Sequence, residues 1–486
     1  MTTNHSDAGL RKNPAGSRTP GKEDLVTADD PRSDSPSRKG AFPDDSTSTK
    51  VSFARDGHAA VTRHDRVART DHRRPGPDRA PCLDQFTDPT QSDTADKVYA
   101  DFTAANPNIK ITREVYSTDQ MRQTVNTALS SGTGPDIIFY DAGPGYAGVL
   151  ANAGLLTPLD QYAQQYGWKD RIAPSSLEAT SLGGKLYGLP LQVDLIGMYY
   201  NQGLFDKEGM TVPQTLDDLV NFCKQAKDKG YTPFAFADNE GWEAFHQFSM
   251  TANQMIGPEA MQNLIVNNQG SWNTPEIITA IKSYFVDLRD AGCFSDDVNA
   301  LKYEDGNSLF YSEQAMVHST GSWLAGQITE NMPDADVRFM PFPELPGAKE
   351  RAWVSGVGSA YYITSGAKNP DAAAKFLDFL FSPEIVTRWV QDASFIVPVQ
   401  FDTSTVQVSP LFKSILDTLQ QASQQGTLFG YNVDVLAPPQ FNDVMTNGFQ
   451  AMLAGDKTPE QQAADLDAAW KEGMQGQGTP QATPGS

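Results

Sequence analysis

Residues 94–140 decide the fold class, and they read TADKVYADFTAANPNIKITREVYSTDQMRQTVNTALSSGTGPDIIFY. Apolar side chains recur at helical spacing up to Phe102, and residues 109–116 then alternate as a strand does. A second amphipathic helix ends at Gly132, a typical helix C-terminal stop. The apolar run 137–140 predicts a buried parallel strand. This alternation of strands and helices predicts an α/β fold with a largely parallel sheet.

The same alternation continues further along the chain. Thr215 and Asp218 have the spacing of a capping box that opens a helix, and residues 316–319 read as a strand. Another helix is predicted to start at Pro370. No internal repeat and no run of 18 apolar residues occurs, so the pattern favours neither a solenoid nor a transmembrane helix.

Composition narrows the classes of function. The 486 residues carry a formal net charge of -22, and 39% of them are hydrophobic. The chain therefore has enough hydrophobic residues to form a large core. Nucleic acid is not expected as a partner, because phosphate binding relies on clustered Lys and Arg. An acidic surface of this kind favours a soluble monomer.

The three cysteines are Cys82, Cys223 and Cys293, and they contain no C-x-x-C pair. A zinc or redox motif is therefore not indicated. A disulfide between Cys223 and Cys293 is compatible with the sequence, which does not decide it. After residue 82 the chain has two histidines, His246 and His318, and no spaced acid cluster, so we expect no metal site and no cofactor.

Residues 1–82 differ in composition from the rest of the chain. They hold 15 Lys+Arg and 12 Asp+Glu, a net charge of +3, so the remainder carries -22 - 3 = -25. Only eight of them are Leu, Ile, Val or Phe. Such a segment buries too little apolar surface to offset its ordering entropy, so we expect disorder. The polar, Gly/Pro-containing residues 475–486 are expected to be disordered as well.

The first 30 residues have no apolar segment of the kind a signal peptide needs. Near Asp84 the amino-acid sequence changes abruptly, and from there on its apolar residues are spaced as in a globular protein. We therefore interpret residues 1–82 as a non-native leader, produced by a frameshift or a miscalled start that replaced an export signal and most of the first strand. Cys82 has no preceding apolar run and does not fit a lipid-anchor cysteine.

The order of several short motifs is more specific than any one of them. Together they resemble the extracellular solute-binding proteins of carbohydrate ABC transporters, the maltose-binding-protein-like family 1. The resemblance covers roughly residues 84–470. The matching segments, in chain order, are 106–111, 134–138, 154–160, 184–190, 198–201, 213–218, 315–317, 321–323 and 372–377.

This resemblance implies a two-lobed periplasmic-binding-protein fold, type II-like, with three interlobe crossings. We place the crossings near residues 192–195, 355–358 and 399–401. Lobe one would comprise 83–192 plus 357–398, and lobe two 195–354 plus 402–474. Ligands of such proteins bind between lobes that close by hinging.

The resemblance further implies an extracellular protein that captures a mono- or oligosaccharide and delivers it to ABC transporter permease subunits in the membrane. We expect a monomer without enzymatic activity. Its natural form would be held at the outer face of the cytoplasmic membrane by a lipid anchor.

A sugar needs aromatic plates for its C–H face and polar partners for its hydroxyl groups. Candidates for these roles stand at strand ends and expected interlobe turns, where open α/β sheets bind ligands. Trp323 is placed in the cleft by the resemblance. The candidate substrate-binding residues are Asp84, Gln85, Tyr140, Asp141, Gly143, Asp194, Trp242, Trp323, Trp353, Gly356, Ser394, Phe395, Tyr431 and Asp434.

Two other classes of function stay open. A carbohydrate-active hydrolase needs two carboxylates that flank one glycosidic bond, and no motif in the sequence pairs two such residues. A binder of a non-sugar small solute is the other alternative. Amino acids and phosphate call for a convergent Arg fork. Arg is sparse in the candidate loops, which favours an uncharged ligand.

Overall fold

The computed structural model describes residues 78–399 and 406–476. The disorder expected for residues 1–77 and 477–486 therefore lies outside the described residues, as does part of the third expected crossing. Residues 475 and 476 belong to the last helix, α18 (Pro459–Gly476), so the expected start of a disordered tail at residue 475 is wrong.

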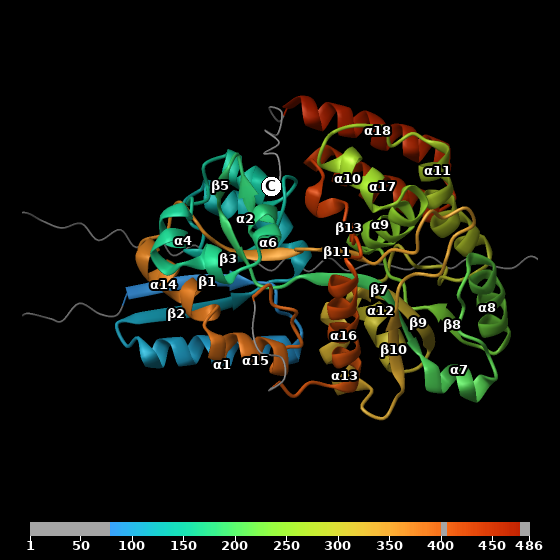
Figure 1. The fold of residues 1–486 in the computed structure, drawn as a ribbon, viewed down its shortest axis with the longest axis horizontal. Coiled ribbons are helices and arrows are strands. Elements are labelled where there is room, and N and C mark those ends of the chain that lie inside the picture. Colours follow the sequence, from blue (N-terminus) through green and yellow to red (C-terminus); the bar gives the residue numbers. More distant parts are fainter. Residues whose placement is uncertain (1–77, 400–405, 477–486) are drawn as a thin grey trace, which may run out of the picture. The chain divides into compact units, whose positions relative to one another are not determined.

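The first sheet has five strands in the order β2-β1-β3-β12-β6. β1 is parallel to both β2 and β3, as the sequence predicts, whereas β12 pairs antiparallel with β3 and β6. Figure 1 shows α1 and α15 along one face of this sheet and α2 and α4 along the other. The strands are β1 (Asp78–Asp84), β2 (Ile109–Val115), β3 (Ile137–Asp141), β6 (Gly188–Pro190) and β12 (Ser359–Ile363).

The first strand is complete rather than truncated. β1 pairs along its whole length with β2, from Asp78 opposite Ile109 to Asp84 opposite Val115. The prediction that most of this strand was lost is therefore wrong, and so is the assignment of residues 78–82 to a disordered segment. This strand is hard to predict from its sequence, because polar residues and proline are depleted in strands and it contains Asp78, Arg79 and Pro81. Ala80 and Cys82 are nevertheless buried on one face.

The helices that accompany the first sheet begin with recognisable caps. Asp88 caps α1 through Gln91 N–H, and Ser117 forms a capping box at the start of α2. The helices are α1 (Pro89–Ala105), α2 (Thr118–Ser130), α3 (Ala147–Asn152), α4 (Asp160–Tyr166), α5 (Trp168–Arg171), α6 (Pro174–Ala179), α14 (Pro370–Leu380) and α15 (Pro383–Asp392). A short hairpin joins β4 (Ser181–Leu182) to β5 (Lys185–Leu186).

The second sheet is mixed rather than largely parallel. Its order is β13-β11-β7-β9-β8, and β10 also pairs with β7. The central strand β7 runs antiparallel to β9, β10 and β11, while β8 is parallel to β9. The strands are β7 (Asp194–Asn201), β8 (Thr232–Phe234), β9 (Ala315–Gly321), β10 (Val337–Met340), β11 (Val354–Gly356) and β13 (Gly430–Tyr431).

Helices and short helical turns complete the second lobe. The predicted capping box at Thr215 and Asp218 is confirmed at the start of α8. The helices are α7 (Gln202–Glu208), α8 (Leu216–Asp228), α9 (Trp242–Ile256), α10 (Pro258–Ile265), α11 (Pro275–Lys282), α12 (Tyr303–Tyr311), α13 (Ala325–Asn331), α16 (Pro410–Gln425) and α17 (Pro439–Leu453). The turns are η1 (Ser283–Leu288), η2 (Ser322–Leu324) and η4 (Asp434–Leu436).

Two crossings join the sheets in the stretches that the sequence indicates. The chain leaves the first sheet after Pro190 and enters the second at Asp194. It returns between Gly356, at the end of β11, and Ser359, at the start of β12. The crossings lie next to each other, because Gly356 pairs with Asp194 across β11 and β7.

The second lobe contains a disulfide bond between Cys223 and Cys293, which the sequence left undecided. It joins α8 to the segment after η1, inside the larger apolar core of the lobe. Cys82 is a buried free thiol. Disulfides persist mainly in oxidising compartments outside the cytoplasm.

Candidate ligand-binding cleft

A cleft of about 180 Å³ lies between the two sheets, and residues of both lobes line it. The two adjacent crossings form its floor through Gln192, Asp194, Gly356 and Gly358. The loop after β1, the end of β3 and the start of α2 supply one wall, and the starts of α9 and α12 supply the opposite one. Ligands commonly bind beyond strand ends in this way in open α/β sheets.

Aromatic rings form the wall on the second lobe. The ring of Trp242 lies 4.6 Å from that of Tyr303 and 6.2 Å from that of Trp323, measured between centroids. The ring of His246 lies 5.3 Å from Trp323. The indole N–H of Trp323 donates to the Tyr303 hydroxyl at 2.8 Å, which holds both rings in place. This wall presents flat apolar faces to the cleft.

His246 is buried in this wall and is neutral at ordinary pH. Burial, together with the smaller effect of the positive charge of Arg122, lowers its pKa to about 3. Its Nδ1 lies 3.8 Å from the Glu243 carboxyl, but burial raises the pKa of Glu243 well above its usual range. The two side chains are therefore a neutral pair, and His246 offers the cleft a neutral ring nitrogen.

The opposite wall carries an ion pair. Arg122 Nε, from α2, contacts the Asp141 carboxylate at the end of β3 at 2.8 Å. The guanidinium also lies 4.6 Å from the centre of the Tyr146 ring, a cation–π contact. Asp141 thus balances part of its charge within the first lobe, and no second Arg stands among the described lining residues to complete the convergent fork that anionic ligands call for.

Two carboxyl groups of the cleft are poorly solvated. Burial raises the pKa of Asp194 to about 7, against the opposing effect of hydrogen bonds from Gln192 at 3.1 Å and Ser322 at 3.3 Å. Burial also raises the pKa of Asp434 to about 7, which the charge of Arg122 partly offsets. Each group therefore gains from a further hydrogen-bond donor.

Several buried polar atoms of the lining residues have no hydrogen-bond partner in the described part of the chain. They are Gln85 Nε2, Gln192 Oε1, His246 Nδ1 and Asp434 Oδ1. Buried polar groups normally have a partner, because an unpaired one costs about 1–3 kcal/mol. The cleft therefore combines unmatched donors and acceptors from both lobes with the aromatic faces of the second lobe.

Half of the candidate residues meet in this cleft. The seven that line it are Gln85, Asp141, Asp194, Trp242, Trp323, Gly356 and Asp434. They come from seven separate segments, which the crossings bring together.

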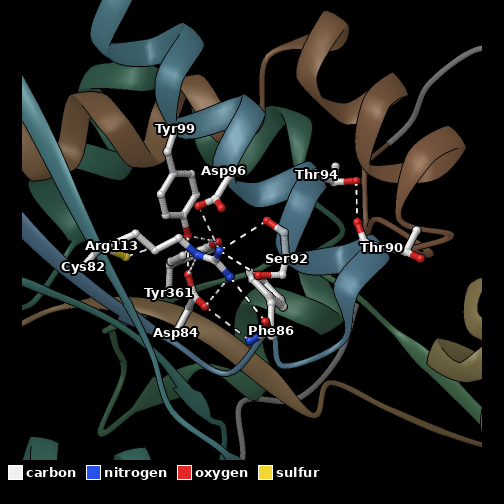
Figure 2. A network of polar contacts seen from close by, with 10 residues as sticks. All are labelled: Cys82, Asp84, Phe86, Thr90, Ser92, Thr94, Asp96, Tyr99, Arg113 and Tyr361. Atoms are coloured by element: carbon white, nitrogen blue, oxygen red, sulfur yellow. Dashed lines mark hydrogen bonds and ion pairs between the residues drawn. The ribbon is translucent and has the colours of Figure 1, made fainter.

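Asp84 is a candidate that lies outside the lining of the cleft. It is completely buried, and Arg113 of β2 contacts both of its carboxylate oxygens, at 2.6 and 2.9 Å. Figure 2 shows the Tyr99 hydroxyl and Phe86 N–H donating to the same carboxylate. Asp84 thus fixes the turn after β1 and does not line the cleft.

Three further candidates are packing residues on the first lobe. Tyr140 lies in an apolar cluster, edge-on to Tyr146 at 6.5 Å. Phe395 packs 5.7 Å from Phe86 in the core. Ser394, at a φ of 55°, lies against Gly326 of α13.

The other three candidates also lie outside the lining of the cleft. Trp353 stacks on Phe339 at 5.3 Å. The backbone of Tyr431 bonds to Asn253 in both directions, at 2.8 and 3.0 Å. Gly143, at a φ of 93°, meets the backbone of Val435 so closely that a Cβ there would lie 1.8 Å from its carbonyl oxygen.

The sequence interpretation missed four prominent residues of the cleft, namely Arg122, Gln192, His246 and Tyr303. The capping box at Ser117 marks the helix start near Arg122, and helix starts commonly face ligand sites. Gln192 lies at the expected first crossing. No sequence signal distinguishes His246 or Tyr303.

Within residues 78–399 and 406–476, no helix combines the length and apolarity needed to cross a bilayer. In the same ranges no three His, Cys, Asp or Glu side chains gather in a way that suits a metal ion.

Two α/β lobes, adjacent crossings and a cleft between them define a two-lobed solute-binding fold. Residues 88–387 match the family model of the bacterial extracellular solute-binding proteins, and this chain belongs to that family.

Relatives with described names support the same assignment. The chain is 28% identical over 302 residues to a putative binding protein of Brucella abortus, covering 61% of this chain and 70% of the relative. It is 27% identical over 316 residues to the multiple sugar-binding protein of Streptococcus mutans, with the same coverage of 61% and 70%. Among solved structures, a chitin oligosaccharide binding protein superposes with a TM-score of 0.71 at 20% identity, over 82% of this chain and 99% of that one.

Proposed function

We propose that this protein captures a sugar in the interlobe cleft and delivers it to the permease subunits of an ABC importer. The observation that carries the proposal is the occurrence of apolar aromatic faces and unpaired polar atoms in one cleft. Trp242, Tyr303 and Trp323 offer apolar faces, while unpaired polar atoms of Gln85 and Asp434 lie in the same cleft. A pyranose ring has both an apolar face and a rim of hydroxyl groups, so it complements both kinds of surface.

The ligand is an uncharged sugar in this proposal. Carboxylates outnumber cationic groups in the lining, and Arg122 is already paired with Asp141. A bound anion would further disfavour the charged forms of Asp434 and Glu240, whose pKa values burial already raises, whereas an uncharged solute would not. The described name of the Streptococcus mutans relative agrees with a sugar ligand.

The two lobes close around the sugar by a hinge motion. Among the described residues, we assign 78–192 plus 357–398 to lobe one and 195–354 plus 406–474 to lobe two. Asp194 and Gly356 pair at the adjacent crossings, so rotation there changes the distance between the walls. The closed pair of lobes presents one continuous surface to the permease.

The natural protein works outside the cytoplasm as a monomer, held to the outer face of the membrane by a lipid anchor. The family name and the Cys223–Cys293 disulfide support an extracellular location. Binding without turnover is the expected behaviour, because members of this family are transporter binding proteins rather than enzymes.

Titration calorimetry of the full chain against a panel of neutral sugars tests this function. We expect saturable binding of at least one sugar, with no hydrolysis product by chromatography after prolonged incubation. Turnover of an oligosaccharide would instead favour the hydrolase. Binding of amino acids or phosphate, but of no sugar, would favour a non-sugar solute.

A further inference from the structure

Protein contacts close one end of the cleft, where α1 meets the second lobe. The Gln91 amide donates to the Trp323 carbonyl at 3.3 Å, and the Thr90 hydroxyl donates to the Glu330 carboxylate. Behind these polar contacts, Leu324 and Ala325 belong to the same apolar cluster as Phe86. These contacts tie the two lobes together at this end and narrow the way out for a chain of sugar rings.

Backbone contacts close the opposite end, beyond Asp141. A Cβ on Gly143 would lie 1.8 Å from the carbonyl oxygen of Val435, and a Cβ on Gly145 would lie 2.9 Å from that of Ala437. Distances below 3.0 Å leave no room even for a methyl group. The loop after β3 and the segment around η4 are thus in direct contact across the two lobes.

The space between these ends is small. Its volume of about 180 Å³ is below the roughly 300–1,000 Å³ of pockets that take drug-sized ligands. Thr87, beside α1, is an exposed lining residue, and on the remaining side Glu304 is exposed while Ser117 and Glu240 are half-buried. A ligand enters there and then meets closed ends on both sides.

We propose that the cleft is built for a single sugar ring, so that the ligand is a monosaccharide rather than an oligosaccharide. This inference rests on the proposed sugar-binding function. Both closed ends and the volume limit the length of the ligand, while the aromatic wall and the unpaired polar atoms recognise its faces. A trisaccharide fits only if at least one of the two interlobe contacts breaks.

The test is a length series measured by calorimetry on the full chain. The probes are xylose, xylobiose and xylotriose, glucose, maltose and maltotriose, and galactose with raffinose. We expect a monosaccharide to bind tightest, with its trisaccharide weaker by about tenfold or more. A disaccharide or longer sugar as the tightest ligand would overturn the inference and leave the proposed function standing. Failure of every sugar would overturn both.

A variant that opens the closed end gives an independent check. Thr90→Ala with Glu330→Ala removes the outer interlobe contact without changing a residue of the lining. The ratio of trisaccharide to monosaccharide affinity should rise about threefold, as expected for loss of one exposed polar contact. Glu384→Ala, an exposed change on α15, is the control and should leave the ratio unchanged. An unchanged ratio in the double variant would count against the closed end.

Discussion

The indole N–H of Trp323 donates a hydrogen bond to the Tyr303 hydroxyl at 2.8 Å, and this bond joins η2 to the start of α12. Because the polar edge of the indole is occupied, its orientation is fixed and its face is left for the cleft. Trp242 lies against the same Tyr303 ring, at 4.6 Å. The aromatic wall is thus preorganised, which lowers the entropic cost of holding a ligand.

Replacing Trp323 by alanine should weaken sugar binding while leaving the fold intact. The loss of its ring removes stacking area, and we expect a dissociation constant about tenfold higher or more, equivalent to about 1.4 kcal/mol. Trp353→Ala is the matched control, because Trp353 stacks on Phe339 outside the lining. Calorimetry of both variants checks this, and an equal loss of sugar affinity in the two variants would argue against a ligand-binding role for the aromatic wall.

Replacing Asp194 by asparagine should flatten the dependence of stability on pH. The folded-state pKa of Asp194 is about 7, above its usual value of 3.8, so the folded chain holds the extra proton. Its contribution to stability is full below pH 4 and is lost as the pH rises through 7. On the order of 2 kcal/mol of the change in stability between pH 5 and pH 8 should disappear in Asp194→Asn. Urea unfolding at both pH values measures it, and identical slopes for variant and parent would contradict the assignment.

Replacing Arg113 by alanine should destabilise the first lobe. The Asp84 side chain is completely buried and would lose both contacts from the guanidinium, which costs about 3–5 kcal/mol for a buried pair. Arg338→Ala is the control, because its pair with Asp336 is about half exposed and is worth about 0–1 kcal/mol. Denaturant unfolding compares the two. The affinity of the folded Arg113 variant for sugar should stay close to the parent value. A loss of affinity without a loss of stability would instead indicate that Asp84 takes part in ligand binding.

Removing the disulfide by Cys223→Ala with Cys293→Ala should lower the free energy of unfolding by about 4 kcal/mol, from the entropy of the 70-residue separation that it closes. A reductant should shift the midpoint of the parent and leave that of the double variant unchanged. Insensitivity of the parent to reductant under unfolding conditions would show that the bond contributes nothing to stability.

The fold was predictable in its class and in the two described crossings. Alternation of strands and helices is a local pattern, and the segments 134–138 and 184–190 carry the family resemblance. The first strand was not predictable, because Asp78, Arg79 and Pro81 mask the burial of its other face. The mixed second sheet also escaped prediction, since the direction in which β7 pairs depends on contacts between residues far apart in the chain.

The site was predictable where a polar or aromatic residue follows a strand, as for Asp141 and Trp323. Sequence reasoning did not predict which candidates have their side chains already engaged by residues that are distant in sequence and close in space. Arg113, 29 residues further along the chain, forms an ion pair with Asp84, and Phe339 stacks on Trp353. Tyr303 joins the cleft through a bond to Trp323 that sequence spacing does not reveal.

The most direct test of the central claim is the thermal unfolding of the full chain with and without neutral sugars. A cognate sugar at 100 times its dissociation constant should stabilise the folded state by about 2.7 kcal/mol. The same sugar concentration should stabilise Trp323→Ala by a smaller amount. A panel of saccharides that leaves the unfolding transition of the parent chain unchanged would contradict the account.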